Sequence, residues 1–316
     1  MAIDGGFDLA GKRVWIAGHR GMVGSAVVQR LAEEPIAAII TAPSSQVDLT
    51  RQDETEAFVL DQRPDVAVIA AAKVGGIHAN RSAQAEFLYD NLMIAANTVA
   101  ASHRAGVKKM VLLGSSCIYP RESPQPIREE FMLTGPLEPT NEGYAVAKIA
   151  TLELGRMFRR QYDADIISLM PTNLYGPGDN YDLETSHVLP ALLRKIHEAK
   201  DGAGAAITIW GSGRPRREFL HVDDLADAIV FALRHYSGEG HLNVGTGEDI
   251  AIADLARLLA DVVGWEGDFE FDTSMPDGMM EKRLDVSKLA DLGWKASIDL
   301  RAGVESTYRS YLDTTG

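Results

Sequence analysis

The chain has 316 residues, of which 46% are hydrophobic and 24% are charged, and these are the proportions of a globular protein rather than of a disordered one. Its formal net charge of −14 disfavours nonspecific binding to nucleic acid or to an anionic membrane, because both carry negative charge. A small anionic ligand held by a local group of Arg and Lys remains compatible with this charge.

A single cysteine excludes an internal disulfide framework and favours a reducing compartment. The segment Met1–Ala10 lacks the basic and apolar regions of a signal peptide. No apolar run approaches the roughly 18 residues that are needed to span a bilayer. We therefore expect a cytoplasmic protein without nucleic-acid or membrane partners.

The first half of the sequence alternates short β-branched segments with longer segments of helical periodicity. The predicted strands are Val14–Ala17, Ala38–Thr41, Val66–Ala71, Met110–Leu113 and Ile166–Leu169. The predicted helices between them are Met22–Ala32, Glu54–Asp61, Glu86–His103 and Tyr144–Tyr162. Strict alternation of strand and helix predicts right-handed crossovers and a doubly wound parallel sheet, that is, an α/β Rossmann fold.

The composition changes after Pro171, where Asn173–His187 is rich in Gly, Pro, Asn and Asp, as is typical of a boundary loop. Beyond it we predict a helix at Leu189–Glu198, a strand at Ile207–Trp210, a loop at Gly211–Arg217, a helix at Asp223–Arg234, a further strand of the main sheet at His241–Val244 and a loop at Met275–Met280. We assign residues 1–172 and 218–246 to a dinucleotide-binding domain. Residues 173–217 and 247–316 are assigned to a smaller mixed α/β substrate-binding domain.

A glycine-rich segment ends the first predicted strand and opens the first predicted helix. Gly18, Gly21 and Gly24 are spaced as G-x-x-G-x-x-G. Gly18 permits a tight turn, Gly21 lets the backbone approach a pyrophosphate, and Gly24 lets helix and strand pack closely. The residues that we assign to the cofactor here are Gly18, His19, Arg20, Gly21, Met22, Val23 and Gly24. A glycine turn without a ligand is the alternative.

The residues after the second predicted strand bear on which dinucleotide binds. An acidic residue at this position holds a ribose hydroxyl of NAD. Here the strand runs into Thr41–Ser45, with no acid before Asp48. Arg20 is placed to reach a 2′-phosphate, and Ser44 and Ser45 are placed to donate to it. These residues favour NADP, with NAD as the alternative.

Three side chains suit the reduction of a carbonyl. Tyr144 and Lys148 lie four residues apart on one helical face, and Ser115 follows the fourth predicted strand at the edge where open α/β sheets bind ligands. A phenol with a pKa of about 10 is a poor acid–base catalyst unless a nearby ammonium lowers that pKa. We expect Lys148 to lower the pKa of Tyr144 and Ser115 to hydrogen-bond the substrate oxygen. A surface Tyr beside an unrelated Lys is the alternative.

With these motifs in place, the chain resembles the extended short-chain dehydrogenase/reductases and, within them, the GDP-L-fucose synthases. The resemblance extends from about Lys12 to Tyr308. The segments that carry it are Gly18–Gly24, Ala70–Ile77, Gly114–Pro120, Leu137–Glu142, Met170–Pro177, Trp210–Gly213 and Arg217–Asp224. Among these, Ala70–Gly76 and Gly114–Pro120 are specific to that family among its relatives.

The resemblance implies a homodimeric 3,5-epimerase/4-reductase that converts GDP-4-keto-6-deoxy-D-mannose to GDP-L-fucose with NADPH. It implies Ser115, Tyr144 and Lys148 for reduction, and Cys117 and His187 as the acid/base pair of epimerisation. The cofactor contacts implied beyond the glycine segment are Ala71, Leu113, Lys148, Pro171, Asn173, Leu174 and His187. The implied substrate contacts are Lys195, Trp210, Arg217 and Asp277, and no metal is implied.

Several of these residues have simpler interpretations. Cys117 is also suited to be a small buried hydrophobe, His187 to cap the helix that follows it, and Trp210 to fill the core of the smaller domain. One departure from the family concerns Thr41–Ser45, where relatives carry arginines. This departure leaves the choice between NADP and NAD open.

Two other functions compete with the one that the resemblance implies. The first is a related sugar-nucleotide 4-epimerase or dehydratase that recycles its NAD internally; Ser116 and Cys117 beside Ser115 argue against a dehydratase, which commonly has acids there. The second is a noncatalytic redox-sensing Rossmann protein, and such proteins tend to lose the Tyr and Lys that are present here as Tyr144 and Lys148.

Overall fold

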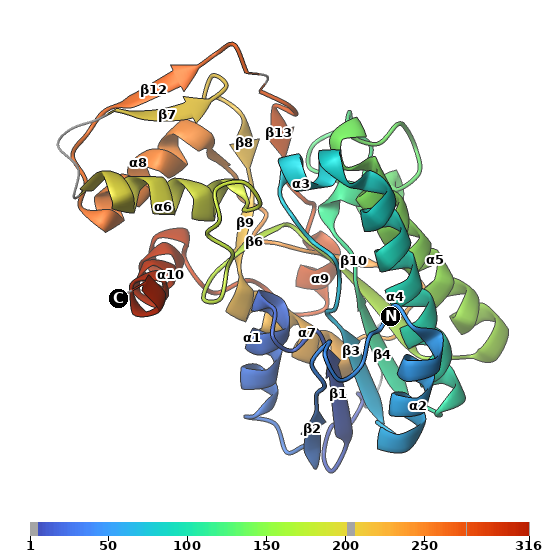
Figure 1. Ribbon diagram of the computed structural model, residues 1–316. Helices are drawn as coiled ribbons and strands as arrows, with labels where there is room; N and C mark the ends of the chain where they lie inside the picture. Colours follow the sequence, from blue (N-terminus) through green and yellow to red (C-terminus); the bar gives the residue numbers. More distant parts are fainter. Residues whose placement is uncertain (1–5, 201–205, 276, 316) are drawn as a thin grey trace.

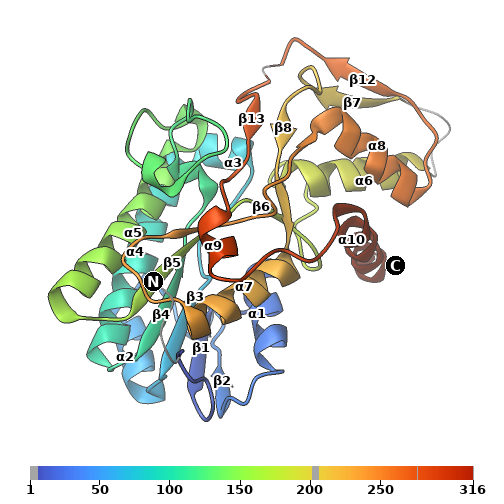
Figure 2. The ribbon, with the colours of Figure 1, turned by 180° about the vertical axis from the view of Figure 1, so that it is seen from behind.

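A computed structural model of the chain describes residues 6–200, 206–275 and 277–315 (Figures 1 and 2). Its centre is a six-stranded parallel sheet. The strands are β1 (Arg13–Ala17), β2 (Ala38–Ile40), β3 (Val66–Ile69), β4 (Lys109–Leu113), β5 (Ile166–Pro171) and β10 (Leu242–Val244). The helices that flank it are α1 (Met22–Leu31), α2 (Gln52–Gln62), α4 (Gln84–Arg104), α5 (Glu142–Tyr162) and α7 (Val222–His235).

The sheet is doubly wound, as the sequence predicts. Its strand order is β10-β5-β4-β3-β1-β2, so the chain leaves β1 toward β2 and then crosses back to β3. Helices α1 and α7 pack together, and α4 packs against both α2 and α5, so that helices cover both faces (Figure 1). This order places the switch point at the carboxyl end of β1, which is where open α/β sheets bind their ligands.

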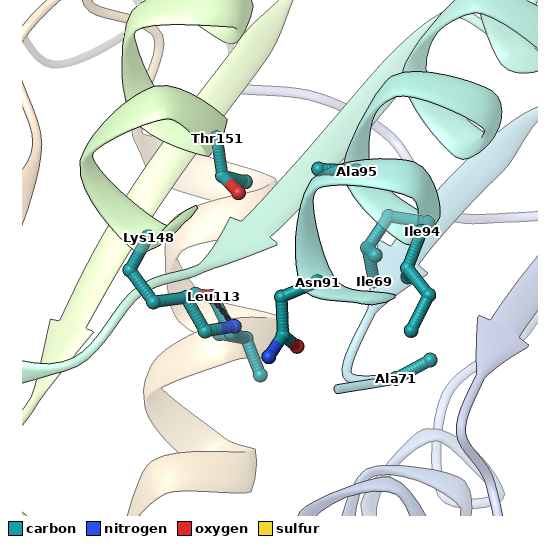
Figure 3. Close-up of a pocket in the computed structure, with 8 residues that line it drawn as sticks. All are labelled: Ile69, Ala71, Asn91, Ile94, Ala95, Leu113, Lys148 and Thr151. Atoms are coloured by element: carbon teal, nitrogen blue, oxygen red, sulfur yellow. Dashed lines mark hydrogen bonds between the residues drawn. The ribbon is translucent and has the colours of Figure 1, made fainter. Parts of the chain in front are cut away.

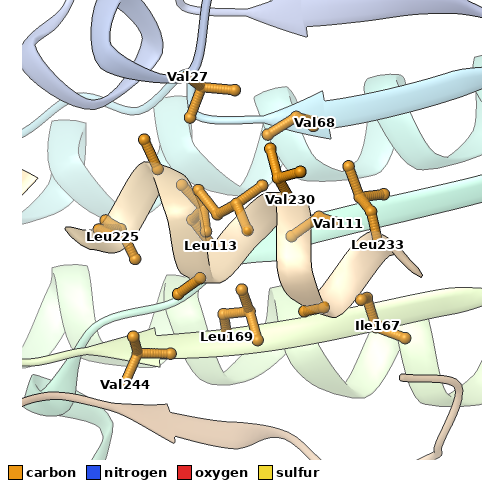
Figure 4. Close-up of a cluster of buried hydrophobic side chains, with 14 of the residues drawn as sticks. Val27, Val68, Val111, Leu113, Ile167, Leu169, Leu225, Val230, Leu233 and Val244 are labelled. Atoms are coloured by element: carbon orange, nitrogen blue, oxygen red, sulfur yellow. The ribbon is translucent and has the colours of Figure 1, made fainter. Parts of the chain in front are cut away.

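The strands are buried on both faces, which explains why their sequences read as continuous apolar runs. All the residues of β3 and β4 are buried. Figure 4 shows side chains of α7, among them Leu225, Val230 and Leu233, lying against Val111 of β4 and Ile167 of β5. The largest core therefore lies between α1, α7 and the sheet.

A second, smaller core lies beside the carboxyl edge of the sheet. It is built from α6 (Val188–Lys200), α8 (Ile252–Val263), α10 (Leu300–Thr315) and the parallel strands β7 (Ile207–Trp210) and β12 (Phe269–Asp272). A small sheet of β8 (Arg216–Arg217), β11 (Ile250–Ala251) and β13 (Glu281–Lys282) and the pair β6 (Asn173–Tyr175) and β9 (Phe219–His221) complete this part. The other short elements are α3 (Ile77–Ser82), α9 (Ser287–Asp291) and the 3-10 turns η1 (Ser116–Ile118), η2 (Glu129–Phe131) and η3 (Pro139–Asn141).

The predicted elements are found with small changes at their ends. The expected strand at His241–Val244 joins the main sheet as β10, and Ile207–Trp210 forms β7. The predicted loop at Gly211–Arg217 ends in the two-residue strand β8, and the loop at Met275–Met280 contains Pro276, which lies outside the described residues.

The division into two domains stays a prediction. The segment after residue 247, assigned to the substrate-binding domain, also contributes Leu289 and Trp294 to the largest core. In the described parts of the chain, no helix is both long enough and apolar enough to cross a membrane.

We call the main sheet with its flanking helices the first unit, and the part built around the second core the second unit. A core substitution is expected to weaken the first unit. Leu233 is fully buried between α7 and the sheet, so Leu233→Ala removes apolar contacts and leaves a cavity. We expect the free energy of unfolding to fall by about 2–5 kcal/mol, measured by urea denaturation followed by circular dichroism. The control is Leu60→Ala, because Leu60 is 42% exposed on α2. Equal losses for the two variants would contradict this packing.

Candidate active site

The glycine segment forms the turn that the sequence predicts at the switch point. Gly18 has φ +85°, and a Cβ there would lie 2.7 Å from the Cα atom of Ala71. A Cβ on Gly24 would overlap the carbonyl oxygen of Gly18. A Cβ on Gly21 would make only an ordinary contact, at 3.5 Å from that oxygen. Close contacts within the protein therefore explain why glycine is required as Gly18 and Gly24. The approach of a ligand remains the predicted reason for glycine as Gly21.

The start of α1 offers backbone donors at the same place. No side chain of a described residue caps this helix, and Gly21 stands at its N-cap position. The first N–H groups of a helix have no partner within the helix, and the dipole there favours negative charge. These groups, on Met22 and the residues after it, suit a phosphate.

Ser115, Tyr144 and Lys148 meet at the carboxyl end of β4. The hydroxyl of Ser115 accepts a hydrogen bond from the backbone N–H of Cys117 at 3.4 Å. The Nζ atom of Lys148 donates to the carbonyl oxygen of Leu113 at 2.8 Å and lies 5.6 Å from the centre of the Tyr144 ring. Figure 3 shows Lys148 of α5 reaching toward Leu113, with Asn91 of α4 facing them across a cavity of about 10 Å³, room for about one water molecule.

Burial controls the proton states of this group. Lys148 is only 7% exposed, and this burial lowers the pKa of its ammonium to about 8. Burial raises the pKa of the Tyr144 phenol, and the nearby Cys117 raises it further. The expected lowering of the Tyr144 pKa by Lys148 stays a prediction, since burial is the larger influence on this phenol. Tyr144 is thus a protonated phenol, a group that can donate a proton.

Cys117 and His187 share a neighbour that the sequence did not single out. Burial raises the pKa of the Cys117 thiol, while the ammonium groups of Lys282 and Lys148 oppose that rise. Desolvation and the charge of Lys282 both lower the pKa of His187. The charge of Lys282, on β13, therefore acts on both, and desolvation lowers the pKa of its own ammonium. The group holds a protonated thiol and a neutral imidazole, one able to donate a proton and the other able to accept one.

The simpler interpretation of His187 finds no support. Its imidazole forms no hydrogen bond with another described residue, so the side chain does not cap α6. Its backbone carbonyl accepts the N–H of Ala191, as the residue before a helix normally does. Cys117 is 7% exposed, as a buried hydrophobe would be, yet it lies among charged and titratable groups.

The four predicted substrate contacts are only partly brought together. The carboxylate of Asp277 accepts hydrogen bonds from the N–H and hydroxyl of Ser212 at 2.6 and 2.8 Å, and its charge opposes the desolvation that lowers the pKa of Arg217. Trp210 is 69% exposed, so the alternative that it fills the second core is wrong. Lys195 lies half-buried on α6 and forms no hydrogen bond or ion pair within the described part of the chain.

The other predicted cofactor contacts lie at the ends of the central strands. Ala71 follows β3, Leu113 ends β4 and Pro171 ends β5. Asn173 and Leu174 form β6, where the amide of Asn173 donates to the backbone carbonyl of Glu218 at 2.8 Å. This places all five along the edge that carries the glycine segment.

Sequence reasoning missed Lys282 and Glu218. Glu218 is 0% exposed, and its carboxylate accepts the N–H groups of Gly247 at 2.8 Å and Leu284 at 2.7 Å. Its own N–H donates to the carbonyl of Lys282 at 3.3 Å, so it fixes the strand that carries Lys282. The only signal in the sequence is a run of charges at Glu281–Arg283, which is typical of a solvated surface.

Comparisons with known proteins agree with this geometry. Residues 14–245 match the model of the NAD dependent epimerase/dehydratase family. A GDP-L-fucose synthase of Sinorhizobium fredii (strain NBRC 101917 / NGR234) is 52% identical over 304 residues, which are 96% of each chain.

Two solved structures are similar over nearly the whole chain. A GDP-6-OMe-4-keto-L-xylo-heptose reductase from C. jejuni has a TM-score of 0.92 at 32% identity, covering 98% of this chain and 100% of that one. A GDP-L-fucose synthetase from Naegleria fowleri bound to NADP has a TM-score of 0.92 at 26% identity, covering 99% of this chain and 98% of that one.

The buried ammonium of Lys148 is expected to lower stability. Its pKa of about 8 lies below the usual 10.5, so the folded state bears the cost of a desolvated charge below pH 8, and this cost disappears as the pH rises toward 10.5. We expect Lys148→Met to raise the free energy of unfolding at pH 7 by about 1–3 kcal/mol, less the hydrogen bond to Leu113. The gain should shrink at pH 10. Urea denaturation at both pH values measures it, and a variant less stable than the parent at pH 7 would contradict it.

Proposed function

Because this chain belongs to the NAD-dependent epimerase/dehydratase family, we propose that it converts GDP-4-keto-6-deoxy-D-mannose to GDP-L-fucose by inverting carbons 3 and 5 and reducing carbon 4. The observation that carries the proposal is that Cys117, next to Ser115 at the end of β4, and His187 both feel the charge of Lys282. A simple ketone reductase needs only Ser115, Tyr144 and Lys148. A second acid/base pair is what an epimerase requires in addition.

The cofactor edge fits a nicotinamide dinucleotide. The turn at Gly18 and the uncapped start of α1 suit its pyrophosphate, and the ends of β3, β4 and β5 suit its nicotinamide half. When bound, NADPH supplies the hydride that carbon 4 receives. Lys148, Asn173 and Leu174 are the residues that would hold the nicotinamide ribose and ring, together with Pro171.

The reduction uses the proton state found at Tyr144. Its protonated phenol donates a proton to the oxygen of carbon 4 as negative charge develops there, and the Ser115 hydroxyl hydrogen-bonds the same oxygen. The ammonium of Lys148 then faces the tyrosinate that remains, at 5.6 Å from the ring centre. The attraction stabilises that anion and favours the transfer.

The epimerisation uses the groups on the other side of the sugar. The keto group acidifies the hydrogens on carbons 3 and 5, so the neutral imidazole of His187 can remove one while the thiol of Cys117 supplies one to the opposite face. Ser115 and Tyr144 hydrogen-bond the enolate oxygen between the two transfers. Arg217, Lys282 and Lys195 supply the positive charge that a GDP diphosphate requires on an acidic protein.

We propose NADP as the dinucleotide. Arg20 is exposed at the end of the glycine turn and forms no hydrogen bond or ion pair with any described residue, so its guanidinium is free for a 2′-phosphate. Asp48, the first acid after β2, is occupied, because it accepts the N–H and hydroxyl of Thr50 at 2.9 and 2.7 Å. A carboxylate held in this way is poorly placed to bind the ribose hydroxyl of NAD.

We also propose a cytoplasmic homodimer. Helices α4 and α5 pack along each other, and their outer faces expose Tyr89 at 62%, Val146 at 39% and Met157 at 42%. Exposed apolar side chains on neighbouring elements commonly mark a protein interface. A second copy of the same helix pair would cover them. The free thiol of Cys117 suits a reducing compartment.

The reaction is tested by supplying the GDP-linked keto sugar with NADPH, following reduced nicotinamide by absorbance and identifying the product by NMR. We expect GDP-L-fucose from the parent. Tyr144→Phe should bind the dinucleotide without transferring hydride, and Cys117→Ser should slow inversion by about 10²–10⁴-fold and yield a reduced sugar that lacks inversion at carbon 3 or 5. No oxidation of NADPH or NADH by the parent would reject the proposal, and normal fucose from Cys117→Ser would remove Cys117 from it.

The cofactor preference is tested at Arg20. Arg20→Ala removes the only charge we assign to the 2′-phosphate, and one such charge-assisted contact contributes about 1.5–3 kcal/mol. We expect the KM for NADPH to rise about tenfold or more while the KM for NADH changes little. Arg13→Ala is the control, because Arg13 lies at the opposite end of β1, where it donates to the carbonyl of Gln62. Equal effects on both cofactors would contradict the assignment.

A further inference from the structure

The segment Ala70–Gly76, which follows β3, is anchored to α4 by groups that the proposed reaction does not use. The ammonium of Lys73 pairs with Glu86 and with Asp90, each at 2.9 Å. The amide of Asn91 accepts the N–H of Lys73 at 2.9 Å and donates to its carbonyl at 3.0 Å. The start of the loop is therefore fixed to the first unit, on the side of the sheet that carries Cys117 and Tyr144.

The far end of the loop contacts the second unit immediately before His187. The N–H of Gly76 donates to the carbonyl of Thr185 at 2.7 Å. The amide of Asn80 holds this end by donating to the carbonyls of Gly75 at 2.5 Å and Gly76 at 3.1 Å. Gly76 is thus held in place from its own side of the contact.

The receiving loop is ordered by its own hydrogen bonds. One carboxylate oxygen of Asp182 accepts the N–H of Glu184 at 3.1 Å, and both the N–H and the hydroxyl of Thr185 at 3.0 and 2.9 Å. Asn180 donates to the same hydroxyl at 2.8 Å. A displacement at Thr185 is therefore transmitted along a stiff segment to His187, two residues further on.

Glycine at position 76 lets this loop approach the backbone of Thr185 and Ser186, and its backbone angles do not require glycine. Its φ of −66° and ψ of −177° are open to any residue. A Cβ there, however, would lie 2.5 Å from the carbonyl oxygen of Ser186 and 3.1 Å from that of Thr185. Both are backbone atoms, so they cannot turn aside as the end of a flexible side chain does.

We propose that Gly76 is a positioning residue that sets His187 against Cys117 by letting the loop after β3 dock on Thr185 and Ser186. This rests on the proposed roles of His187 and Cys117 in epimerisation. The two groups stand on different units, and acid–base groups lose efficiency when they are misplaced by more than about 0.5 Å. The contact at Gly76 joins the two units next to His187. It acts on inversion and not on hydride transfer, because Ser115, Tyr144 and Lys148 all lie on the first unit.

The test separates the two half-reactions in Gly76→Ala. Inversion is followed as uptake of solvent deuterium at carbons 3 and 5 of the keto sugar without NADPH, and reduction as hydride transfer with it. We expect exchange to fall about 10- to 100-fold in Gly76→Ala, with hydride transfer at saturating NADPH within about twofold of the parent. The product with NADPH then contains reduced sugar that lacks inversion. Val74→Ala is the matched control, because Val74 belongs to the same loop and is 64% exposed.

The ratio of exchange to reduction is the deciding measurement, since a general loss of structure lowers both rates together. Asn80→Ala is a second variant, in case Gly76→Ala fails to fold, because it removes only the hydrogen bonds that hold the end of the loop. A lowered ratio in either folded variant supports the inference, and a ratio like that of the parent in the folded variants overturns it. A parent that neither exchanges nor reduces would instead reject the proposed function, so the two failures are distinguishable.

Discussion

The ammonium of Lys148 is enclosed at the carboxyl edge of the parallel sheet, where the carbonyl of Leu113 is its hydrogen-bond partner. A charge in such a place costs stability, and the fold tolerates it because this edge is where the chain collects its reactive groups. Parallel strands all end at the same edge. The glycine turn after β1, the loop after β3, Ser115 and Cys117 after β4 and the segment after β5 therefore lie along the same edge as this ammonium. Burial of this ammonium therefore lowers its pKa and also lowers the stability of the folded protein.

In the predicted division of the chain, the proposed site draws on two units, and each contributes a different chemistry. The first unit contributes the phenol, the ammonium, the serine hydroxyl and the thiol. The second contributes His187, Lys282 and Arg217. Among the contacts that join the two units, two lie next to predicted site residues: Glu218 binds the backbone around Lys282 to the turn after β10, and Gly76 binds the segment before His187 to the loop after β3. The contact of Glu218 is made by its buried carboxylate, and the contact of Gly76 is made by backbone atoms alone.

The sequence predicts the parts of this molecule whose signal is local. Strands β1 and β3–β5 read as apolar runs because they are buried on both faces, and Gly18 and Gly24 stand where a turn and a close approach require glycine. The three-residue strands β6 and β9 are too short to show a period, and the six-residue helix α3 is nearly so. Lys282 and Glu218 come close to the site only through tertiary folding. The raised pKa of Tyr144 has the same origin, since desolvation depends on the whole surroundings and a helical spacing does not show it.

The order in which the strands and helices appear along the chain affects how the protein is synthesised. The sheet is completed by β10 at Leu242–Val244, after the chain has already entered the second unit, and the second core is closed only when Val304 and Tyr311 of α10 arrive. A growing polypeptide emerging from the ribosome therefore leaves part of the apolar surface around α8 uncovered until α10 is made. Neither unit is one continuous stretch of chain that could fold before the other is synthesised. Both cores are therefore completed late and almost together.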